Sequence, residues 1–226
     1  MKQEWAFNGS TADFIQAEQV EFADLLRALP RDAWAEPSLC EGWSVRDVVV
    51  HSAAHIHNQQ QNQTLISRYA SGPVDALIVW LESNPAESTE SAYQARRRFA
   101  DIQRGELMVH QQDIRRALGI PRVISQERVQ GVLAFGLQPI GSLGQAFGRE
   151  RAKGLRLVSS ENDWTWGTGK EVRGSLEALL MASAGRAVAL EELDGPGVDV
   201  LAHRVHHPPK VLHDLIEYSA TVNPVQ

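Results

Sequence analysis

The 226-residue chain contains a single cysteine, Cys40, which excludes an internal disulfide and a zinc site built from several cysteines. No apolar run approaches the ~20 residues that a membrane-spanning helix needs. The N-terminus, from Met1 to Trp5, lacks the apolar core of a signal peptide. We therefore expect a cytoplasmic protein in which any metal ion is held by histidine, aspartate or glutamate.

Basic charge is also scarce, because 22 lysines and arginines face 28 aspartates and glutamates, for a formal net charge of −6. A protein that binds a phosphate backbone needs clustered basic residues to displace counterions. The tightest basic cluster, residues 96–98, is short and lies in a helical pattern, so an exposed helix face explains it. We expect neither a nucleic acid nor a membrane as partner.

Apolar residues recur at helical spacing in the first half of the chain. The pattern predicts four helical segments, which are residues 10–29, a segment that begins at residue 44, residues 74–81 and residues 91–118. The polar run at 58–63 leaves open where the second segment ends. Four such segments favour a helical bundle.

The pattern changes after about residue 150. Residues 155–158 and 164–166 alternate like two short strands, residues 175–189 read as a helix, and residues 210–218 are a candidate last helix. We predict a mainly α protein in which a helical bundle, residues 1–148, precedes a small α+β domain, residues 149–226.

Acidic and imidazole side chains share faces of two predicted helices. Glu106 and His110 are four residues apart and therefore point the same way, and Asp113 lies close to the same stripe. His51 and His55 are a similar pair on the second helix. A carboxylate and imidazoles that meet from two antiparallel helices are typical of a site for zinc or a similar ion. Three protein ligands leave one coordination position open, which is a feature of catalytic zinc sites.

Spacing alone does not decide between His51 and His55, and a core or surface histidine is the commoner explanation of each. His203 and His207 are also four residues apart, but Pro208 follows at once, and we interpret that cluster as a loop.

Residues 37–51 (PSLCEGWSVRDVVVH) and 106–116 (ELMVHQQDIRR) resemble two motifs of the mycothiol-dependent maleylpyruvate isomerase family, a branch of the DinB-like metalloproteins. Short segments similar to the smaller C-terminal region of that family are residues 154–158, 163–164, 167–169, 172–174, 184–186 and 193–198. The resemblance implies metal ligands at His51, Glu106 and His110, and no such role for His55.

The resemblance further implies a DinB-like four-helix bundle, a divalent metal that we expect to be zinc, and mycothiol as cosubstrate. It implies an enzyme that transfers the thiol to a small electrophile or isomerises that electrophile from cis to trans, as a monomer or homodimer. The three ligands would act only as ligands. Residues 69–103 diverge from the family, and the second motif reads His110-Gln111-Gln112-Asp113 where relatives often have His-Gly-Gln-Asp, so the substrate stays open.

Two acids and the cysteine have alternative interpretations. Asp47, one turn before His51, is placed either to hydrogen-bond that imidazole or to cap the helix together with Ser44. Asp113 either hydrogen-bonds His110 or is a surface acid. Cys40 has no nearby charge in the sequence to activate it, and we interpret it as a small buried residue at a helix entry.

Two other functions fit the same set of ligands. One is a non-catalytic metal-containing binding or stress-response module, and the other is a metal-dependent hydrolase with water at the open position. Turnover that depends on a thiol separates the first proposal from both.

Overall fold

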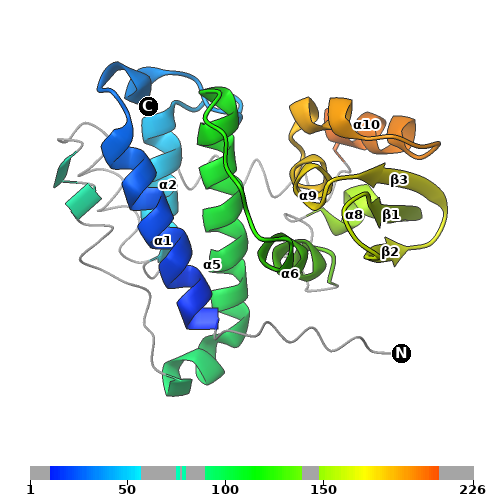
Figure 1. The fold of residues 1–226 in the computed structure, drawn as a ribbon, viewed down its shortest axis with the longest axis horizontal. Helices are drawn as coiled ribbons and strands as arrows, with labels where there is room; N and C mark the ends of the chain where they lie inside the picture. Colours follow the sequence, from blue (N-terminus) through cyan, green and yellow to red (C-terminus); the bar gives the residue numbers. More distant parts are fainter. Residues whose placement is uncertain (1–10, 57–74, 77, 80–89, 139–147, 209–226) are drawn as a thin grey trace. The chain divides into compact units, whose positions relative to one another are not determined.

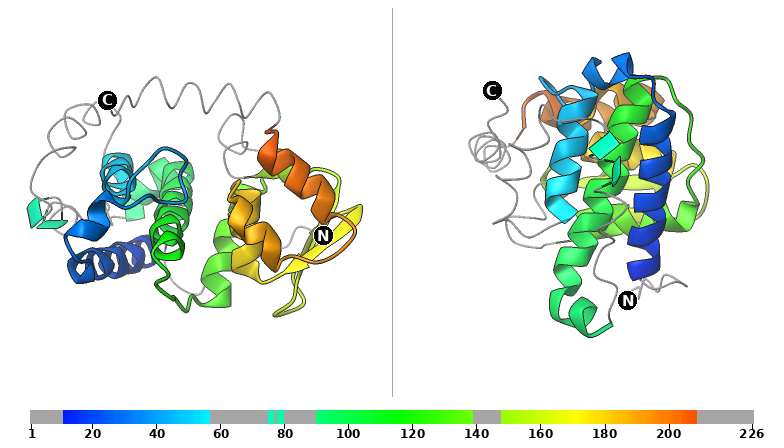
Figure 2. Two further views of the ribbon diagram at one scale, coloured as in Figure 1. Left: turned by 90° about the horizontal axis from the view of Figure 1, so that it is seen from above. Right: turned by 90° about the vertical axis from the view of Figure 1, so that its left-hand side faces the viewer.

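The computed structural model describes residues 11–56, 75–76, 78–79, 90–138 and 148–208 (Figures 1 and 2). The chain forms two compact units, of which unit 1 is Met1–Val123 together with Asn223–Gln226, and unit 2 is Ile124–Val222. This division lies earlier than the boundary at residue 148 that the sequence pattern predicts, because the helix that follows Ile124 packs within unit 2.

Unit 1 is built from helices. They are α1 (Thr11–Ala28), the short 3-10 helix η1 (Asp32–Ala35), α2 (Val45–Ile56) and α5 (Glu90–Ala117). Figures 1 and 2 show α1, α2 and α5 side by side, and α5 contacts both of the others. The predicted helix at 74–81 lies mainly outside the described residues, but Asp75, Ala76, Ile78 and Val79 are helical.

Apolar side chains from all three long helices form the core of unit 1, as their helical spacing predicts. Fully buried members are Phe22, Leu26, Val45, Val48, Val49, Leu107 and Ile114. Burying each large aliphatic or aromatic side chain contributes about 1.5–3 kcal/mol, so this shared core fixes α2 against α5.

The start of α2 is set by a capping box. The backbone N–H of Ser44 donates to Asp47 Oδ2 at 2.8 Å, and the backbone N–H of Asp47 donates to Ser44 Oγ at 3.3 Å. At the same end of the bundle, α5 stops before Gly119, whose φ of 66° suits a residue without a side chain. The N–H of Ile120 then donates to the carbonyl of Arg115 at 2.8 Å.

A buried ion pair ties the segment after α5 to α1. The Arg122 guanidinium donates to both carboxylate oxygens of Glu18, at 2.9 and 3.0 Å, and also contacts Glu21. The Arg122 and Glu18 side chains are 4% and 0% exposed. Gln111 on α5 donates to Glu18 as well, so the carboxylate joins three parts of unit 1.

Unit 2 combines short helices with a three-stranded sheet. Its elements are α6 (Gln126–Gly136), α8 (Arg149–Ala152), β1 (Leu155–Ser159), β2 (Thr165–Gly167), β3 (Lys170–Gly174), α9 (Leu176–Ser183), the 3-10 helix η2 (Ala187–Glu192) and α10 (Val198–His206). The sheet order is β2-β1-β3, with β1 antiparallel to β2 and parallel to β3. The predicted fold class, a mainly α protein with a helical bundle before a small α+β part, is confirmed.

Two predictions for unit 2 were wrong in detail. The predicted helix 175–189 ends at Ser183, because the chain turns at Gly185, where φ is 95°, before η2 begins. His203 does not lie in a loop, since α10 continues to His206, and the ring of His207, the first residue after the helix, stacks on the His203 ring at a centroid distance of 4.7 Å. Pro208 restricts the residue before it rather than the preceding turns, so the helix persists up to that point.

The predicted helix at 210–218 lies outside the described residues. Among the helices that the structure describes, none combines the length and the apolar character needed to cross a bilayer.

Candidate metal centre

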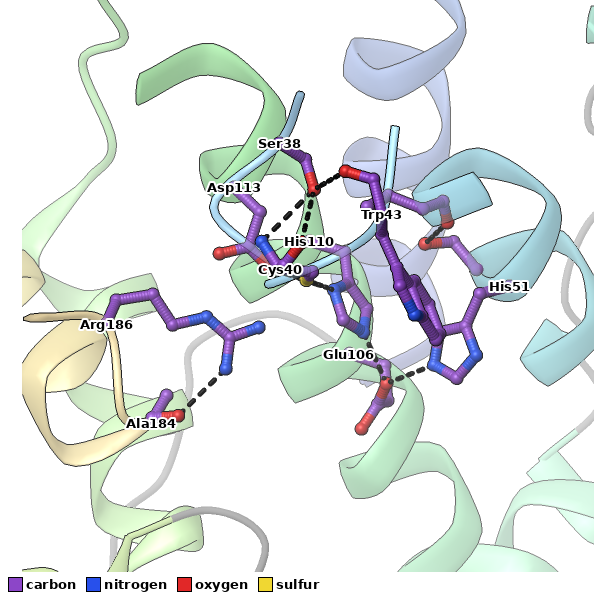
Figure 3. Close-up of polar contacts among 11 residues, drawn as sticks. Ser38, Cys40, Trp43, His51, Glu106, His110, Asp113, Ala184 and Arg186 are labelled. Atoms are coloured by element: carbon purple, nitrogen blue, oxygen red, sulfur yellow. Dashed lines mark hydrogen bonds and ion pairs between the residues drawn. The ribbon is translucent and has the colours of Figure 1, made fainter. Parts of the chain in front are cut away.

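Two helices bring together the three side chains that the motifs single out. Glu106 and His110 project from the same face of α5, and His51 faces them from α2 (Figure 3). Glu106 Oε2 lies 3.0 Å from His110 Nε2 and 3.5 Å from His51 Nε2. One potential donor atom from each residue lies within 4.8 Å of the other two.

The donor set fits a divalent metal. The His51, His110 and Glu106 side chains are only 11%, 10% and 19% exposed, so the polar atoms converge in a largely buried setting that retains an opening to solvent. Imidazole nitrogens with a carboxylate oxygen are common ligands of zinc and its neighbours. With neutral imidazoles and one carboxylate, a divalent ion here would keep one net positive charge.

Asp113 supports His110 from the side opposite Glu106. His110 Nδ1 lies 2.9 Å from Asp113 Oδ2, while Nε2 of the same ring faces Glu106. The Asp113 side chain is fully buried, which excludes a surface acid. A carboxylate in this position orients a ligating imidazole and determines which nitrogen presents its lone pair.

Asp47 has the other of its two predicted roles. Its Oδ2 accepts hydrogen bonds from the Ser44 hydroxyl at 2.6 Å and from the Ser44 backbone N–H, so the structure shows it capping α2. The His51 ring instead packs edge-on against Trp43, with centroids 4.9 Å apart. The side chain of His55, in the last turn of α2, lies outside the described part.

Cys40 is the site neighbour that sequence reasoning missed. Its Sγ lies 3.1 Å from Asp113 Oδ2 and 3.8 Å from His110 Nδ1. The thiol is half-buried rather than part of the core, and it forms with Asp113 and His110 a second group of potential metal donors within 4.8 Å of one another. No sequence pattern pointed to this contact, because Cys40 and Asp113 are 73 positions apart.

The departure of the second motif from the family pattern lies away from the donor atoms. Gln111 is fully buried, donates to Glu18 on α1 and accepts a hydrogen bond from Arg115 at 3.0 Å. It therefore joins α5 to α1, whereas Glu106 and His110 face α2. A glutamine at this position leaves the three converging side chains in place.

The surroundings of His110 favour its protonated form. Burial lowers the pKa of His110, but hydrogen bonds with Asp113, Cys40 and Glu106 and the charge of Glu106 outweigh burial and raise the pKa well above 6.5. Because the pKa of His110 is higher in the folded protein than in the unfolded protein, its protonation stabilises the fold. The stabilisation is complete at pH values below the unfolded-state pKa and is lost as the pH rises through the folded-state pKa. In its protonated form, the His110 imidazolium can donate to both Glu106 and Asp113.

Zinc binding at neutral pH is expected to release about one proton from His110, because a metal ligand must be the neutral imidazole. Calorimetric titration of chelator-stripped protein at pH 7, in buffers of different ionisation enthalpy, measures this release directly. A binding heat that is the same in every buffer would show that His110 is already neutral and that its pKa is not raised.

The fold and the site together define a helical bundle with a convergent histidine–glutamate–histidine set, followed in the chain by an α+β unit. Residues 15–77 match the family model described as the mycothiol maleylpyruvate isomerase N-terminal domain, in agreement with the resemblance of the first motif, residues 37–51, to that family. The matched residues include His51 and end before Glu106 and His110.

Solved structures show the same fold. The crystal structure of the mycothiol-dependent maleylpyruvate isomerase and that of a histidine-to-alanine mutant of it each match with a TM-score of 0.56 and 14% sequence identity. Each match covers 82% of this chain and 91% of the other. No curated protein matches the chain.

Proposed function

We propose that the chain is a metal-dependent enzyme that activates a low-molecular-weight thiol, with mycothiol as the expected cosubstrate, for attack on a small electrophile. The observation that carries the proposal is the convergence of His51, Glu106 and His110 from two helices, with one donor atom of each within 4.8 Å of the others. The names of the matched domain and of the solved isomerase support mycothiol as the thiol.

The residues of the chain have separate parts in this chemistry. His51 and His110 would hold a divalent metal, expected to be zinc, through imidazole nitrogens, and Glu106 would supply the one negative charge among the ligands. When bound, the metal supplies Lewis acidity that lowers the pKa of a thiol and raises the thiolate fraction near neutral pH. Asp113 keeps the Nδ1 proton of His110, so that Nε2 stays turned toward Glu106.

A thiolate formed at this site has two outcomes with an electrophilic carbon. If the new carbon–sulfur bond persists, with halide expelled from a haloarene or a proton added to the neighbouring carbon of a former double bond, the reaction is S-transfer. If the bond breaks again after rotation about the former double bond, the reaction is cis–trans isomerisation and the thiol is regenerated. We favour S-transfer, because relatives that share the metal site need not share that substrate and because residues 69–103, about half of which the structure describes, diverge from the family pattern.

Metal-loaded protein is expected to accelerate the reaction of mycothiol with electrophiles such as haloarenes or maleylpyruvate, and chelator-stripped protein is not. Glu106→Gln keeps the shape of the ligand but removes its charge, so both metal affinity and rate should fall. The rate enhancement should shrink as the pH approaches the pKa of the free thiol, about 8.5, where thiolate is abundant without help. Product formation followed by absorbance or chromatography, with and without mycothiol, measures all three effects.

The same assay distinguishes the alternatives. Turnover that does not need a thiol would identify a hydrolase, with water as the reacting group. No turnover with any thiol across a broad panel of electrophiles, in protein that retains its metal, would identify a binding module. A negative result with maleylpyruvate alone decides nothing, because the proposal does not commit to that substrate.

A further inference from the structure

The loop that leads into α2 is held in shape by hydrogen bonds between its own residues. The backbone N–H and the hydroxyl of Ser38 both donate to the carbonyl of Trp43 at 2.9 Å, and the N–H of Trp43 donates to the carbonyl of Cys40 at 3.0 Å. Gly42 turns the chain with a φ of 77°, a conformation that favours glycine. We call residues 38–43 the entry loop; its internal hydrogen bonds hold the Cys40 and Trp43 backbones in fixed positions.

The entry loop touches both sides of the metal centre (Figure 3). On the α5 side, the N–H of Leu39 donates to the carbonyl of Asp113 at 3.2 Å, and the Cys40 thiol lies 3.1 Å from Asp113 Oδ2. On the α2 side, the Trp43 ring packs edge-on against His51. One short segment therefore contacts the support of one histidine and the ring of the other.

The Cys40 thiol is placed to donate a hydrogen bond to the buried carboxylate of Asp113. A fully buried carboxylate is costly unless hydrogen bonds replace the water it has lost, and Oδ2 of Asp113 is close to both the Cys40 thiol and His110 Nδ1. Two donors on one oxygen restrict the direction of the carboxylate. Because that carboxylate orients the imidazole, the thiol acts on His110 through Asp113.

We propose that Cys40 is a positioning residue of the metal centre, whose S–H donates to Asp113 and thereby holds His110 with Nε2 toward Glu106 and His51. The inference rests on the proposed metal site and adds a residue outside its ligand set. The competing arrangement has Cys40, Asp113 and His110 as the ligands themselves. The structure favours the first, because the Asp113 side chain is fully buried whereas Glu106 retains an opening to solvent.

Cobalt(II) binding to the full chain tests this arrangement. Cys40→Ala removes the donor and should weaken cobalt affinity about tenfold, at the lower end of the 10–100-fold range for groups that orient metal ligands. Cys40→Ser keeps a donor and should restore most of the affinity. Ser52→Ala is the matched control, because it removes a buried hydrogen bond to the Val48 carbonyl on the same helix as His51 and should leave the affinity unchanged.

A double-mutant cycle separates positioning from a general loss of structure. Asp113→Asn should weaken cobalt binding by itself, and Cys40→Ala should then have little further effect, because Cys40 acts through Asp113. Additive losses, or wild-type affinity in Cys40→Ala, would overturn the proposal. If Cys40→Ala does not fold, Cys40→Val, which removes the donor but keeps a side chain of similar size, takes its place in the same cycle.

The cobalt spectrum distinguishes the two ligand sets. The proposal requires visible d–d bands without a sulfur-to-cobalt charge-transfer band in the near ultraviolet. A charge-transfer band that disappears in Cys40→Ala would make Cys40 a ligand and overturn it. Failure of the thiol-transfer assay with an intact cobalt site would contradict the proposed function and leave the positioning role standing.

Discussion

We expect the purified wild-type chain to carry about one divalent ion, and the His51→Ala and His110→Ala proteins to lose it. Each variant removes one of only three protein ligands, so the loss should far exceed the roughly 10–100-fold effect of changing a group behind a ligand. Elemental analysis after gel filtration, together with a competition titration against a chelator of known affinity, measures the change.

His55→Ala is the matched control, since it changes a histidine one helical turn from His51 on α2. It should retain the wild-type metal content. Full occupancy in His51→Ala and His110→Ala would refute the site. Metal loss in His55→Ala alone would show that His55, one helical turn further along α2, is the ligand in place of His51.

Arg122→Met should lower the free energy of unfolding of the bundle by about 3 kcal/mol, the low end of the range for breaking one side of a buried ion pair. In the variant, the fully buried Glu18 carboxylate loses both of the hydrogen bonds that Arg122 donates to it. Urea unfolding followed by far-ultraviolet circular dichroism reports the change in midpoint and slope.

Arg31→Ala provides the comparison, because its ion pair with Asp75 lies on the surface, with both side chains exposed. Such pairs contribute about 0–1 kcal/mol, so the unfolding midpoint should hardly move. The double variant Glu18→Met, Arg122→Met removes the buried charge as well and should recover part of the loss. Equal destabilisation by Arg31→Ala and Arg122→Met would contradict a special role for the buried pair.

The parts of the site that depend on local geometry could be predicted from the sequence. Glu106 and His110 share a helix face because of their four-residue spacing, and the structure brings them within 3.0 Å. Ser44 and Asp47 have capping-box spacing, and the cap is formed. The choice of His51 over His55 came from family resemblance, because periodicity places both near the apolar stripe.

Sequence patterns could not predict the contacts between segments that lie far apart in the chain. The contact of Cys40 with Asp113 depends on how the entry loop packs on α5, and the sequence around either residue does not indicate it. Strand β3 was missed because Val172 is the one large apolar side chain buried in its five residues, so the alternation is weak. Its parallel pairing with β1 is likewise a tertiary property.

The three converging side chains, His51, Glu106 and His110, and their neighbours Cys40 and Asp113 all belong to unit 1. All of these residues lie upstream of Ile124, so one continuous segment of the gene encodes the whole candidate ligand set and its supports.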